Sequence, residues 1–285
     1  MRKYPFCMER HGYPRQRWLH IWEIVLYFLL LVLVLRQLFT WQDNSSRSET
    51  IIVITPTHKR PERLADMTRL AQTLSHIDNL HWIVVEDGKS KIAAVERILL
   101  RSGLPYTYFT ATTEPGFPKR GWTHRNMALR FIRRHYKDYD GDAVIYFGDD
   151  DNSYDTRLFD NYIRNVKKIG FWAVGLAGTG LVEAPHVVNG TIASWDVVYL
   201  PGRPFALDMA GFAVNLKLIL EYPRAEFGRA CTTRTGETCF LEQFNLTKEQ
   251  CEPFGYEDDP KEILVWHTKT SNMGTKGSRH GYVIE

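Results

Sequence analysis

Short apolar runs alternate with helical stretches between residues 51 and 151 of this chain. Ile51–Ile54, Trp82–Val85 and Val144–Phe147 are typical of strands buried on both faces, and Tyr106–Thr110 is a further candidate strand. Apolar residues at helical spacing follow Pro61, extend over 92–99 and precede His135. This alternation predicts an α/β fold with a mostly parallel sheet and right-handed crossovers.

Polar residues stand where three of these strands end. Pro56 and Thr57 follow the first strand, Asp87 ends the second, and the triplet Asp149–Asp151 follows the last. The carboxyl ends of parallel strands share one edge of a sheet, which is where open α/β folds bind ligands. We therefore expect these residues to converge on one site.

The acidic triplet is the most specific of these features. Asp149, Asp150 and Asp151 repel one another, and a divalent cation would offset that repulsion. Ligands that are all oxygen suit Mg²⁺ or Mn²⁺. For an isolated triplet a solvated acidic turn is the favoured interpretation, but the position at a strand end favours a ligand site.

Two arginines precede the triplet and make a nucleotide the expected ligand. Arg120 and Arg125 can meet an anionic group, since guanidinium geometry suits phosphate oxygens. Asp87 is a candidate partner for a ribose or base donor. Glycine-rich Walker and dinucleotide fingerprints are absent from the sequence, which favours metal-held recognition. Taken singly, Asp87 fits a turn and Arg125 fits a solvated helix residue.

The amino-terminal part has the pattern of a membrane anchor. A charge-free apolar run, Ile24–Leu35, lies within residues 21–41, which are long enough to span a bilayer as a helix. Residues 1–20 hold five basic residues and one acidic residue, which keeps them in the cytoplasm. A cleaved signal peptide is the alternative, but no small-residue cleavage site follows. We expect a cytoplasmic tail (1–20), a signal-anchor (21–41) and a short stem (42–50).

Several features fit a luminal location for the rest of the chain. Asn44, Asn189 and Asn245 lie in N-glycosylation triplets, although Asn189-Gly190 also fits the turn of a hairpin between 181–188 and 191–199. One pair among Cys231, Cys239 and Cys251 can close a disulfide and leave one thiol. The net charge is +3, and without the basic tail the chain is about neutral, which argues against a nucleic-acid partner.

Eight ordered blocks run across residues 51–268: Ile54–Thr57, Trp82–Asp87, Gly121–Leu129, Tyr146–Asn152, Gly170–Leu176, Arg203–Phe205, Asp208–Ala213 and Leu264–Thr268. Together these blocks resemble the β-1,3-glucuronyltransferase family of the animal Golgi. The resemblance implies a single-pass type II protein of the Golgi membrane with a Rossmann-like nucleotide-sugar transferase fold. It also implies Mn²⁺-dependent use of UDP-glucuronate, with a donor half (51–151) and a smaller acceptor half (152–285).

The resemblance also assigns roles by position. Family positions that hold the UDP-sugar fall on Pro56, Thr57, Asp87, Arg120, Arg125, Asp149, Asp150 and His267. Asp151 matches the metal ligand and Glu237 the catalytic base. Glu183, Arg203 and Asp208 match contacts to the acceptor or the donor sugar. Without the family, Glu237 would be interpreted as an acid in the first turn of a helix.

These parts suit an inverting transfer, in which a base removes the proton of an acceptor hydroxyl as its oxygen attacks the anomeric carbon. The expected acceptor is the 3-hydroxyl of a terminal galactose, on a proteoglycan linker or a glycoprotein. Tyr199 stands where the family usually has tryptophan, and Lys269 where it often has arginine, so the acceptor is less defined than the donor. A homodimer is a candidate assembly.

Two other functions stay open at this point. A membrane-anchored, metal-dependent phosphohydrolase would use strand-end aspartates, and hydrolysis of a phosphoester without a sugar acceptor would favour it. Its usual pattern, a nucleophilic Asp with a second Asp two residues on, belongs on the first strand of the domain. A non-catalytic luminal glycan-binding protein on the same fold would tolerate Glu237→Gln.

Overall fold

The computed structural model describes residues 25–33, 36, 49–228, 235–268 and 270. It divides into two compact units, Met1–Ser48 and Glu49–Glu285. In the first unit, residues 25–33 are helical and exposed. Within the described ranges, no helix combines the length and the apolar character that crossing a membrane requires. The predicted tail, most of the predicted anchor and most of the predicted stem lie outside the described residues.

The second unit is built on a mixed sheet. Its described residues form seven strands in the order β11-β6-β10-β4-β1-β2-β3. The strands are β1 (Thr50–Thr57), β2 (Leu80–Asp87), β3 (Tyr106–Ala111), β4 (Ala143–Phe147), β6 (Ile169–Phe171), β10 (Phe212–Asn215) and β11 (Glu252–Pro253). The neighbours β3, β2, β1 and β4 are parallel, as predicted, whereas β10 is antiparallel to both β4 and β6. The chain beyond residue 151 thus adds β10, β6 and β11 to the same sheet, with β10 antiparallel to its neighbours and β11 parallel to β6.

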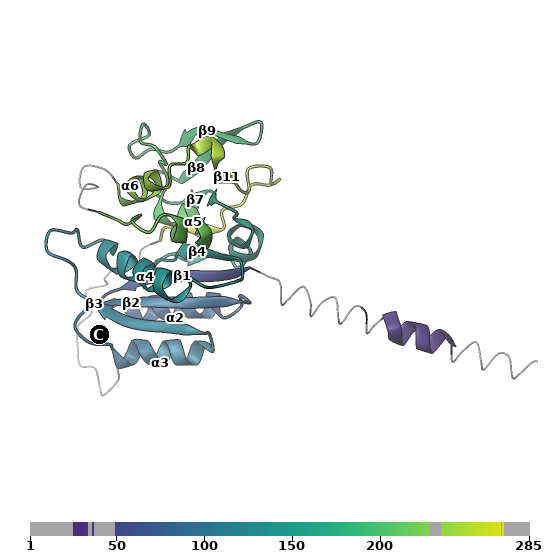
Figure 1. Cartoon of the computed structure of the whole chain (residues 1–285). Helices are drawn as coiled ribbons and strands as arrows, with labels where there is room; N and C mark the ends of the chain where they lie inside the picture. The colour runs from purple at the N-terminus through teal and green to yellow at the C-terminus, as the bar shows by residue number, and fades with distance from the viewer. Residues whose placement is uncertain (1–24, 34–35, 37–48, 229–234, 269, 271–285) are drawn as a thin grey trace, which may run out of the picture. The chain divides into compact units, whose positions relative to one another are not determined.

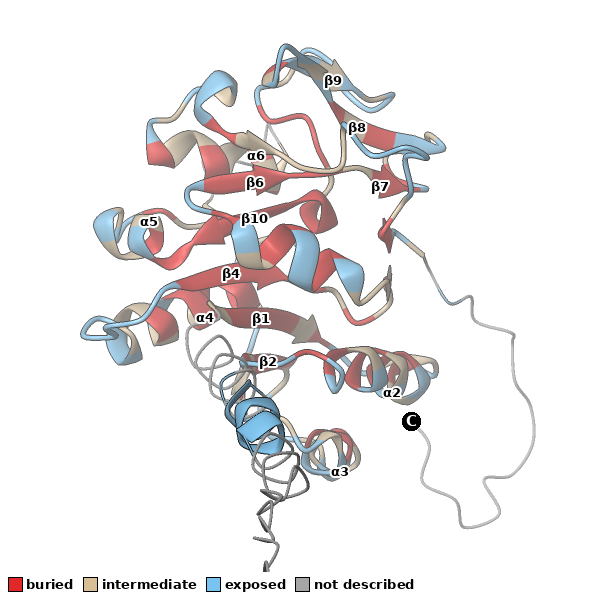
Figure 2. Cartoon of the chain, turned by 90° about the vertical axis from the view of Figure 1, so that its right-hand side faces the viewer, coloured by how far each residue is buried: buried red, intermediate tan, exposed pale blue. Residues whose placement is uncertain are grey.

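Helices cover both faces of this sheet (Figures 1 and 2). Helices α2 (Arg63–Leu74) and α3 (Ala93–Ser102) pack on one face, and α4 (Trp122–His135), α5 (Leu216–Glu221) and α6 (Gly236–Leu241) pack on the other. Along β1, Ile51 and Val53 belong to the hydrophobic core under α2 and α3, and Ile52 and Ile54 belong to the core under α4, α5 and α6. Because both faces are covered, the strand is a continuous apolar run rather than an alternating one.

A smaller sheet lies at the end of the unit away from α3 (Figures 1 and 2). In the described chain it has the order β5-β12-β7-β8-β9, with β5 (Ser153–Tyr154), β12 (Val265–Trp266), β7 (Val174–Gly175), β8 (Val182–Val188) and β9 (Thr191–Asp196). The predicted β8–β9 hairpin is confirmed, with Asn189 and Gly190 at φ values of 51° and 76° as its two-residue turn requires. Its second strand ends at Asp196 and not at Tyr199 as predicted.

Short helical turns lie between the strands of the second half of the chain. They are η1 (Leu158–Tyr162), η2 (Ile163–Asn165), η3 (Met209–Gly211), η5 (Glu242–Phe244) and η6 (Lys248–Gln250). Of the cysteines discussed above, Cys239 is disulfide-bonded and Cys251 is a buried free thiol. Of the glycosylation candidates, Asn189 and Asn245 are exposed and Asn44 lies outside the described residues.

Candidate active site

The register of the main sheet brings the strand ends together. Ile54 pairs with Phe147, and the Gly148 amide donates to the Ile54 carbonyl at 3.0 Å. The Thr55 hydroxyl donates to the Gly148 carbonyl at 2.7 Å. The acidic triplet therefore begins beside the end of β1, as expected for parallel neighbours.

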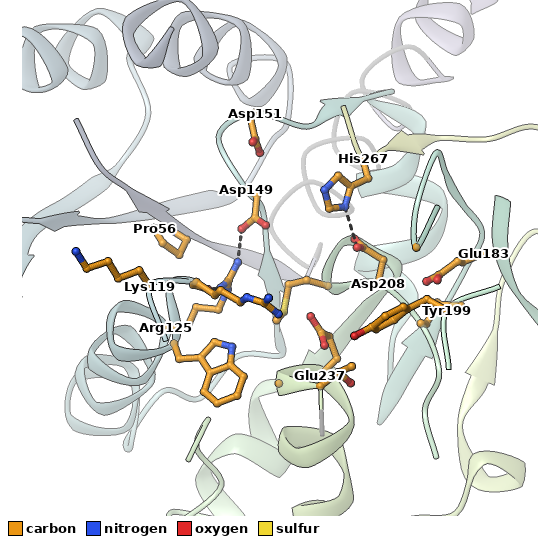
Figure 3. Close-up of a pocket in the computed structure, with 18 of the residues that line it drawn as sticks. Pro56, Lys119, Arg125, Asp149, Asp151, Glu183, Tyr199, Asp208, Glu237 and His267 are labelled. Atoms are coloured by element: carbon orange, nitrogen blue, oxygen red, sulfur yellow. Dashed lines mark hydrogen bonds and ion pairs between the residues drawn. The ribbon is translucent and has the colours of Figure 1, made fainter. Parts of the chain in front are cut away.

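A cavity of about 800 Å³ opens at this edge (Figure 3). The candidate site residues that line it are Pro56, Arg120, Arg125, Asp149, Asp150, Asp151, Glu183, Arg203, Asp208, Glu237 and His267. A cavity of this size is typical of sites that enclose a small organic molecule.

The residues that line the cavity form two groups, one on each side of it. We call the first the triplet wall: Pro56, Arg120, Arg125, Asp149–Asp151 and His267. We call the second the glutamate wall: Glu183, Tyr199, Arg203, Asp208 and Glu237. Figure 3 shows Asp149 and Asp151 on one side of the opening, with Glu237, Glu183 and Tyr199 on the other.

Arg125 holds the first carboxylate of the triplet. Its guanidinium donates to Asp149 and, at 2.8 Å, to the Arg120 carbonyl, so the helix fixes both the aspartate and the loop before it. Burial raises the pKa of Asp149 despite the opposing effect of Arg125. The side chain of Asp149 is 28% exposed, so it still reaches the cavity.

The second carboxylate is more fully engaged. Asp150 accepts a bond from the Thr57 hydroxyl at 2.7 Å and is bridged by Arg60, with nitrogen–oxygen distances of 3.0 and 2.9 Å. Thr57 is not among the residues that line the cavity, and its side chain contacts the triplet through this bond to Asp150. Both oxygens of Asp150 are thus already paired with protein donors.

The third carboxylate is the one left available. Among the described residues, the Asp151 side chain makes no hydrogen bond or ion pair, while its backbone carbonyl accepts from Arg69 and Thr268 at 2.7 Å each. Burial, followed by Asp149 and Asp150, raises the pKa of Asp151 to about 6. Because ionisation of Asp151 costs free energy at this position, a bound cation would stabilise its charged form.

His267 and Asp208 connect the two walls. The His267 Nδ1 lies 2.8 Å from Asp208 Oδ2, and this hydrogen bond raises the pKa of His267 to about 9. Asp208 also accepts a bond from the Ala210 amide at 3.0 Å. The imidazole is therefore held as a cation at the cavity.

Glu237 enters the cavity from the first turn of α6, as Figure 3 shows. A Cβ at Gly236 would come within 2.6 Å of the Trp122 indole nitrogen, so the absence of a side chain lets α6 approach α4. Burial, followed by repulsion from Asp208, raises the pKa of Glu237. A carboxylate with a raised pKa is a stronger base.

Glu183 is a second buried carboxylate on the same wall. Its Oε1 is buried without a hydrogen-bond partner among the described residues, and the side chain packs on Gly178, where a Cβ would lie 1.9 Å away. Burial raises the pKa of Glu183 to about 7, against the opposing effect of Arg203. An unpaired buried oxygen is costly and marks a place that a ligand hydroxyl would satisfy.

Tyr199 and Arg203 form a stacked pair beside Glu183. The Arg203 guanidinium carbon lies 5.3 Å from the centre of the Tyr199 ring. The loops around this pair contain residues at positive φ that are not glycine: Leu176, Thr179, Leu200 and Phe205. Such conformations cost free energy and often occur at ligand sites.

Some residues of the site differ from the sequence expectation. Asp87 is not among the residues that line the cavity; it accepts from both the amide and the hydroxyl of Thr113, and His124 lies 3.4 Å away. His58 and Lys119 do line it and were not anticipated. His58 directly follows the last residue of β1, so its position after a strand end could have predicted it. Lys119 lies in the loop before α4, and no pattern in the sequence predicts that it lines the cavity.

No group of three or more His, Cys, Asp or Glu side chains within the described residues is arranged to enclose a metal ion. The protein offers a single available carboxylate at the triplet wall. That donor set suits Mg²⁺ or Mn²⁺, which often bind one or two carboxylates and complete their shell with substrate phosphates and water.

Comparisons with known proteins identify the family of the chain. Residues 70–271 match the family described as glycosyltransferase family 43. The galactosylgalactosylxylosylprotein 3-beta-glucuronosyltransferase 2 of Homo sapiens is 41% identical over 231 residues, which cover 79% of this chain and 70% of that protein. The enzyme numbered 1 under the same name, also from Homo sapiens, is 39% identical over 256 residues, covering 83% and 74%.

A nematode protein is similar to the same extent. The galactosylgalactosylxylosylprotein 3-beta-glucuronosyltransferase sqv-8 of Caenorhabditis elegans is 40% identical over 231 residues, which cover 77% of this chain and 64% of that protein. Among solved structures, S. aureus TarS 1-349 in complex with UDP-GlcNAc matches with a TM-score of 0.49 and 14% identity, covering 78% of this chain and 59% of that one. A likeness that distant supports no conclusion on function.

Proposed function

This chain belongs to glycosyltransferase family 43, and we propose that it transfers glucuronic acid from UDP-glucuronate to the 3-hydroxyl of a terminal galactose on a glycan. The reaction is inverting and depends on Mn²⁺. The observation that carries the proposal is the position of Glu237, which faces the acidic triplet across one cavity. The names of the similar proteins support the sugar and the linkage.

The triplet wall binds the donor. Asp151 would hold the Mn²⁺, because it is the triplet member whose carboxylate has no partner among the described residues. When bound, the ion supplies positive charge where UDP leaves. Lys119, Arg120 and His267 bring further positive charge to the same cavity and stabilise the diphosphate as it departs.

The glutamate wall binds the acceptor and carries out the proton transfer. Tyr199 offers its ring to the apolar face of a sugar, while Glu183 accepts a hydrogen bond from an acceptor hydroxyl. Glu237 takes the proton from the attacking 3-hydroxyl. The new bond forms between that oxygen and the anomeric carbon as the bond to UDP breaks, so no covalent intermediate with the protein is needed.

We propose that this reaction takes place in the lumen of the Golgi. The disulfide at Cys239 supports an oxidising compartment, and Asn189 and Asn245 are exposed as glycosylation would require. Residues 21–41 would anchor the chain, with residues 1–20 in the cytoplasm. A reporter fused to residue 1 should be accessible to protease in sealed microsomes while the folded unit is protected.

A transfer assay on the full-length chain tests the activity. UDP-glucuronate, UDP-glucose and UDP-GlcNAc are each offered with a panel of galactosides after chelation and after adding back Mn²⁺. We expect a β1,3-linked glucuronide only with UDP-glucuronate, a terminal galactose and Mn²⁺. Linkage is assigned by NMR of the product, and Glu237→Gln serves as the control.

The outcomes separate the alternatives. Absence of transfer across the panel with metal present would overturn the proposal. Release of phosphate without any sugar product would indicate a phosphohydrolase. Tight binding of galactosides that Glu237→Gln leaves unchanged, with no turnover, would indicate a glycan-binding protein.

A further inference from the structure

A buried carboxylate outside the cavity connects to the triplet through several side chains. Asp66 lies in the first turn of α2, is fully buried and does not line the cavity. Its partners are two arginines and a threonine, and each of these leads toward the loop that carries Asp150 and Asp151. Two guanidinium groups and a hydroxyl therefore donate to one fully buried carboxylate.

The first connection runs through Arg60. Its Nη2 lies 2.8 Å from Asp66 Oδ2, and the same guanidinium bridges both oxygens of Asp150 at 3.0 and 2.9 Å. Asp66 therefore aims the guanidinium that orients Asp150. The fork geometry of arginine makes this coupling directional, since both carboxylates share one planar group.

The second connection runs through Arg69 to the backbone of the triplet. Arg69 Nη2 lies 3.2 Å from Asp66 Oδ1 and donates to the Asp151 carbonyl at 2.7 Å. The peptide that follows the available carboxylate is thus bonded to a side chain that Asp66 holds. Movement of Arg69 would move the point from which the Asp151 side chain extends.

The third connection reaches the segment after β12. The Thr270 hydroxyl donates to Asp66 Oδ1 at 2.7 Å, and the Thr268 hydroxyl donates to the Asp151 carbonyl at 2.7 Å. His267, which lines the cavity, directly precedes Thr268. One buried carboxylate therefore joins the triplet and the segment that carries His267.

We propose that Asp66 is a positioning residue for the metal-binding loop, acting through Arg60 and Arg69 to fix the direction of the Asp151 carboxylate. This inference rests on the proposed function, because it takes Asp151 as the ligand of Mn²⁺. A purely structural ion cluster would affect only the stability of the fold. A positioning role additionally requires that the metal site fail when Asp66 is neutralised in a protein that is still folded.

The test measures Mn²⁺ binding directly. Asp66→Asn keeps the shape and removes the charge that holds both arginines. Titration of Mn²⁺ into the full-length chain with saturating UDP, read from the EPR signal of free Mn²⁺, should show affinity weakened on the order of tenfold to a hundredfold, as for changes around metal ligands elsewhere. The KM for Mn²⁺ should rise by the same factor, with a smaller change in kcat at saturating metal.

Two further variants make the outcome decisive. Asn215→Ala removes a buried amide that caps α5 and bonds the Val166 carbonyl at 3.1 Å, away from the cavity, so it matches the destabilisation without the metal effect. Arg69→Ala changes a side chain that is 41% exposed and should fold even if Asp66→Asn does not. We expect it to weaken Mn²⁺ binding severalfold, whereas Asn215→Ala leaves it unchanged.

The failures are distinguishable. If the unmodified chain binds no Mn²⁺ in the presence of UDP, the proposed function and this inference both fall. If it binds Mn²⁺ and the folded Asp66→Asn and Arg69→Ala variants bind it equally tightly, only the inference is overturned. An equal loss of affinity in Asn215→Ala would also overturn it, since the effect would then follow from stability alone.

Discussion

The two walls of the cavity differ in how their carboxylates are partnered. On the triplet wall, Asp149 is paired with Arg125, and Asp150 with Arg60 and Thr57. On the glutamate wall, Glu183 has a buried oxygen without a partner among the described residues, and its pKa is raised to about 7. Two of the three carboxylates on the triplet wall are thus paired with protein donors before any substrate arrives, whereas Glu183 has a buried oxygen in a costly state that an acceptor would relieve.

The backbone shows the same difference. The triplet follows β4 at the end of a regular parallel strand. The loops beside the glutamate wall hold Leu176, Thr179, Leu200 and Phe205 at positive φ, a conformation that costs roughly 1–3 kcal/mol for each such residue. Among the described residues that surround the cavity, this backbone strain therefore lies on the side that we assign to the acceptor.

The largest effect should come from the base. Glu237→Gln keeps the shape of the glutamate wall but cannot accept a proton, so kcat should fall roughly a hundredfold to ten-thousandfold. The affinity for UDP, which we assign to the triplet wall, should stay within about twofold. Steady-state kinetics measures kcat, and calorimetry measures the affinity for UDP. A loss of UDP affinity as large as the loss of kcat would contradict the assignment of separate roles to the two walls.

The free-energy cost of ionising the buried Glu183 carboxyl should make the stability of the protein depend on pH. Its pKa in the folded protein, about 7, lies above the ordinary value of 4.5, so folding retains a proton. The free energy of unfolding should therefore fall as pH rises from about 4.5 to about 7 and then level off. Glu183→Gln should flatten this slope and raise stability at pH 8 by up to about 3 kcal/mol while weakening acceptor binding.

Urea unfolding of the two proteins at pH 4, 6 and 8 checks the sign. Arg133→Lys, which alters a partly buried charge on α4 that pairs with Glu226, serves as a control whose slope between pH 4.5 and 7 should match that of the unmodified chain. A slope of the opposite sign, or one that Glu183→Gln leaves unchanged, would show that ionisation of Glu183 does not destabilise the folded protein.

Breaking the pairing on the triplet wall should destabilise the protein instead. Arg125→Met leaves Asp149 without its cation and removes the bond to the Arg120 carbonyl. Loss of one partner of a fully buried pair costs about 3–5 kcal/mol, and with Asp149 28% exposed we expect about 2 kcal/mol. Thermal unfolding measures it, and an unchanged midpoint would mean that the triplet wall is not held by this pair.

The smallest effect should be at Tyr199. Tyr199→Ala removes the ring that stacks under Arg203 and faces the cavity, and should raise the acceptor KM by about fivefold, which corresponds to about 1 kcal/mol. Tyr199→Phe retains the stacking surface and should leave KM nearly unchanged. Equal effects of the two substitutions would assign the role to the hydroxyl rather than the ring.

The sequence predicted the parallel half of the fold well because burial on both faces leaves continuous apolar runs such as Ile51–Ile54. It also located the triplet, since three adjacent acids at a strand end are conspicuous. The antiparallel strand β10 (Phe212–Asn215) and the strands of two residues in the second sheet are too short to have a periodicity of their own. Their place is set by packing against β4, β6 and β8.

The site shows a similar limit. The family resemblance located Glu237, Glu183 and Asp208, which come from distant segments and have no local pattern that predicts their meeting. Asp87 lies at a strand end as expected and accepts from Thr113 in the structure, and its assignment to the donor site stays a prediction. No pattern in the sequence predicts which neighbour satisfies a carboxylate, and that choice decides whether it faces a ligand.

Calorimetric titration of UDP into the Asp151→Asn and Glu237→Gln variants, each with and without Mn²⁺, tests the division between the walls most directly. The unmodified chain should bind UDP at least tenfold more tightly with Mn²⁺ than without it, in line with the expected contribution of a metal ligand set. Asp151→Asn should lose that difference and Glu237→Gln should retain it. If Asp151→Asn kept the full effect of Mn²⁺, or if both variants lost it, the assignment of donor to one wall and base to the other would be contradicted.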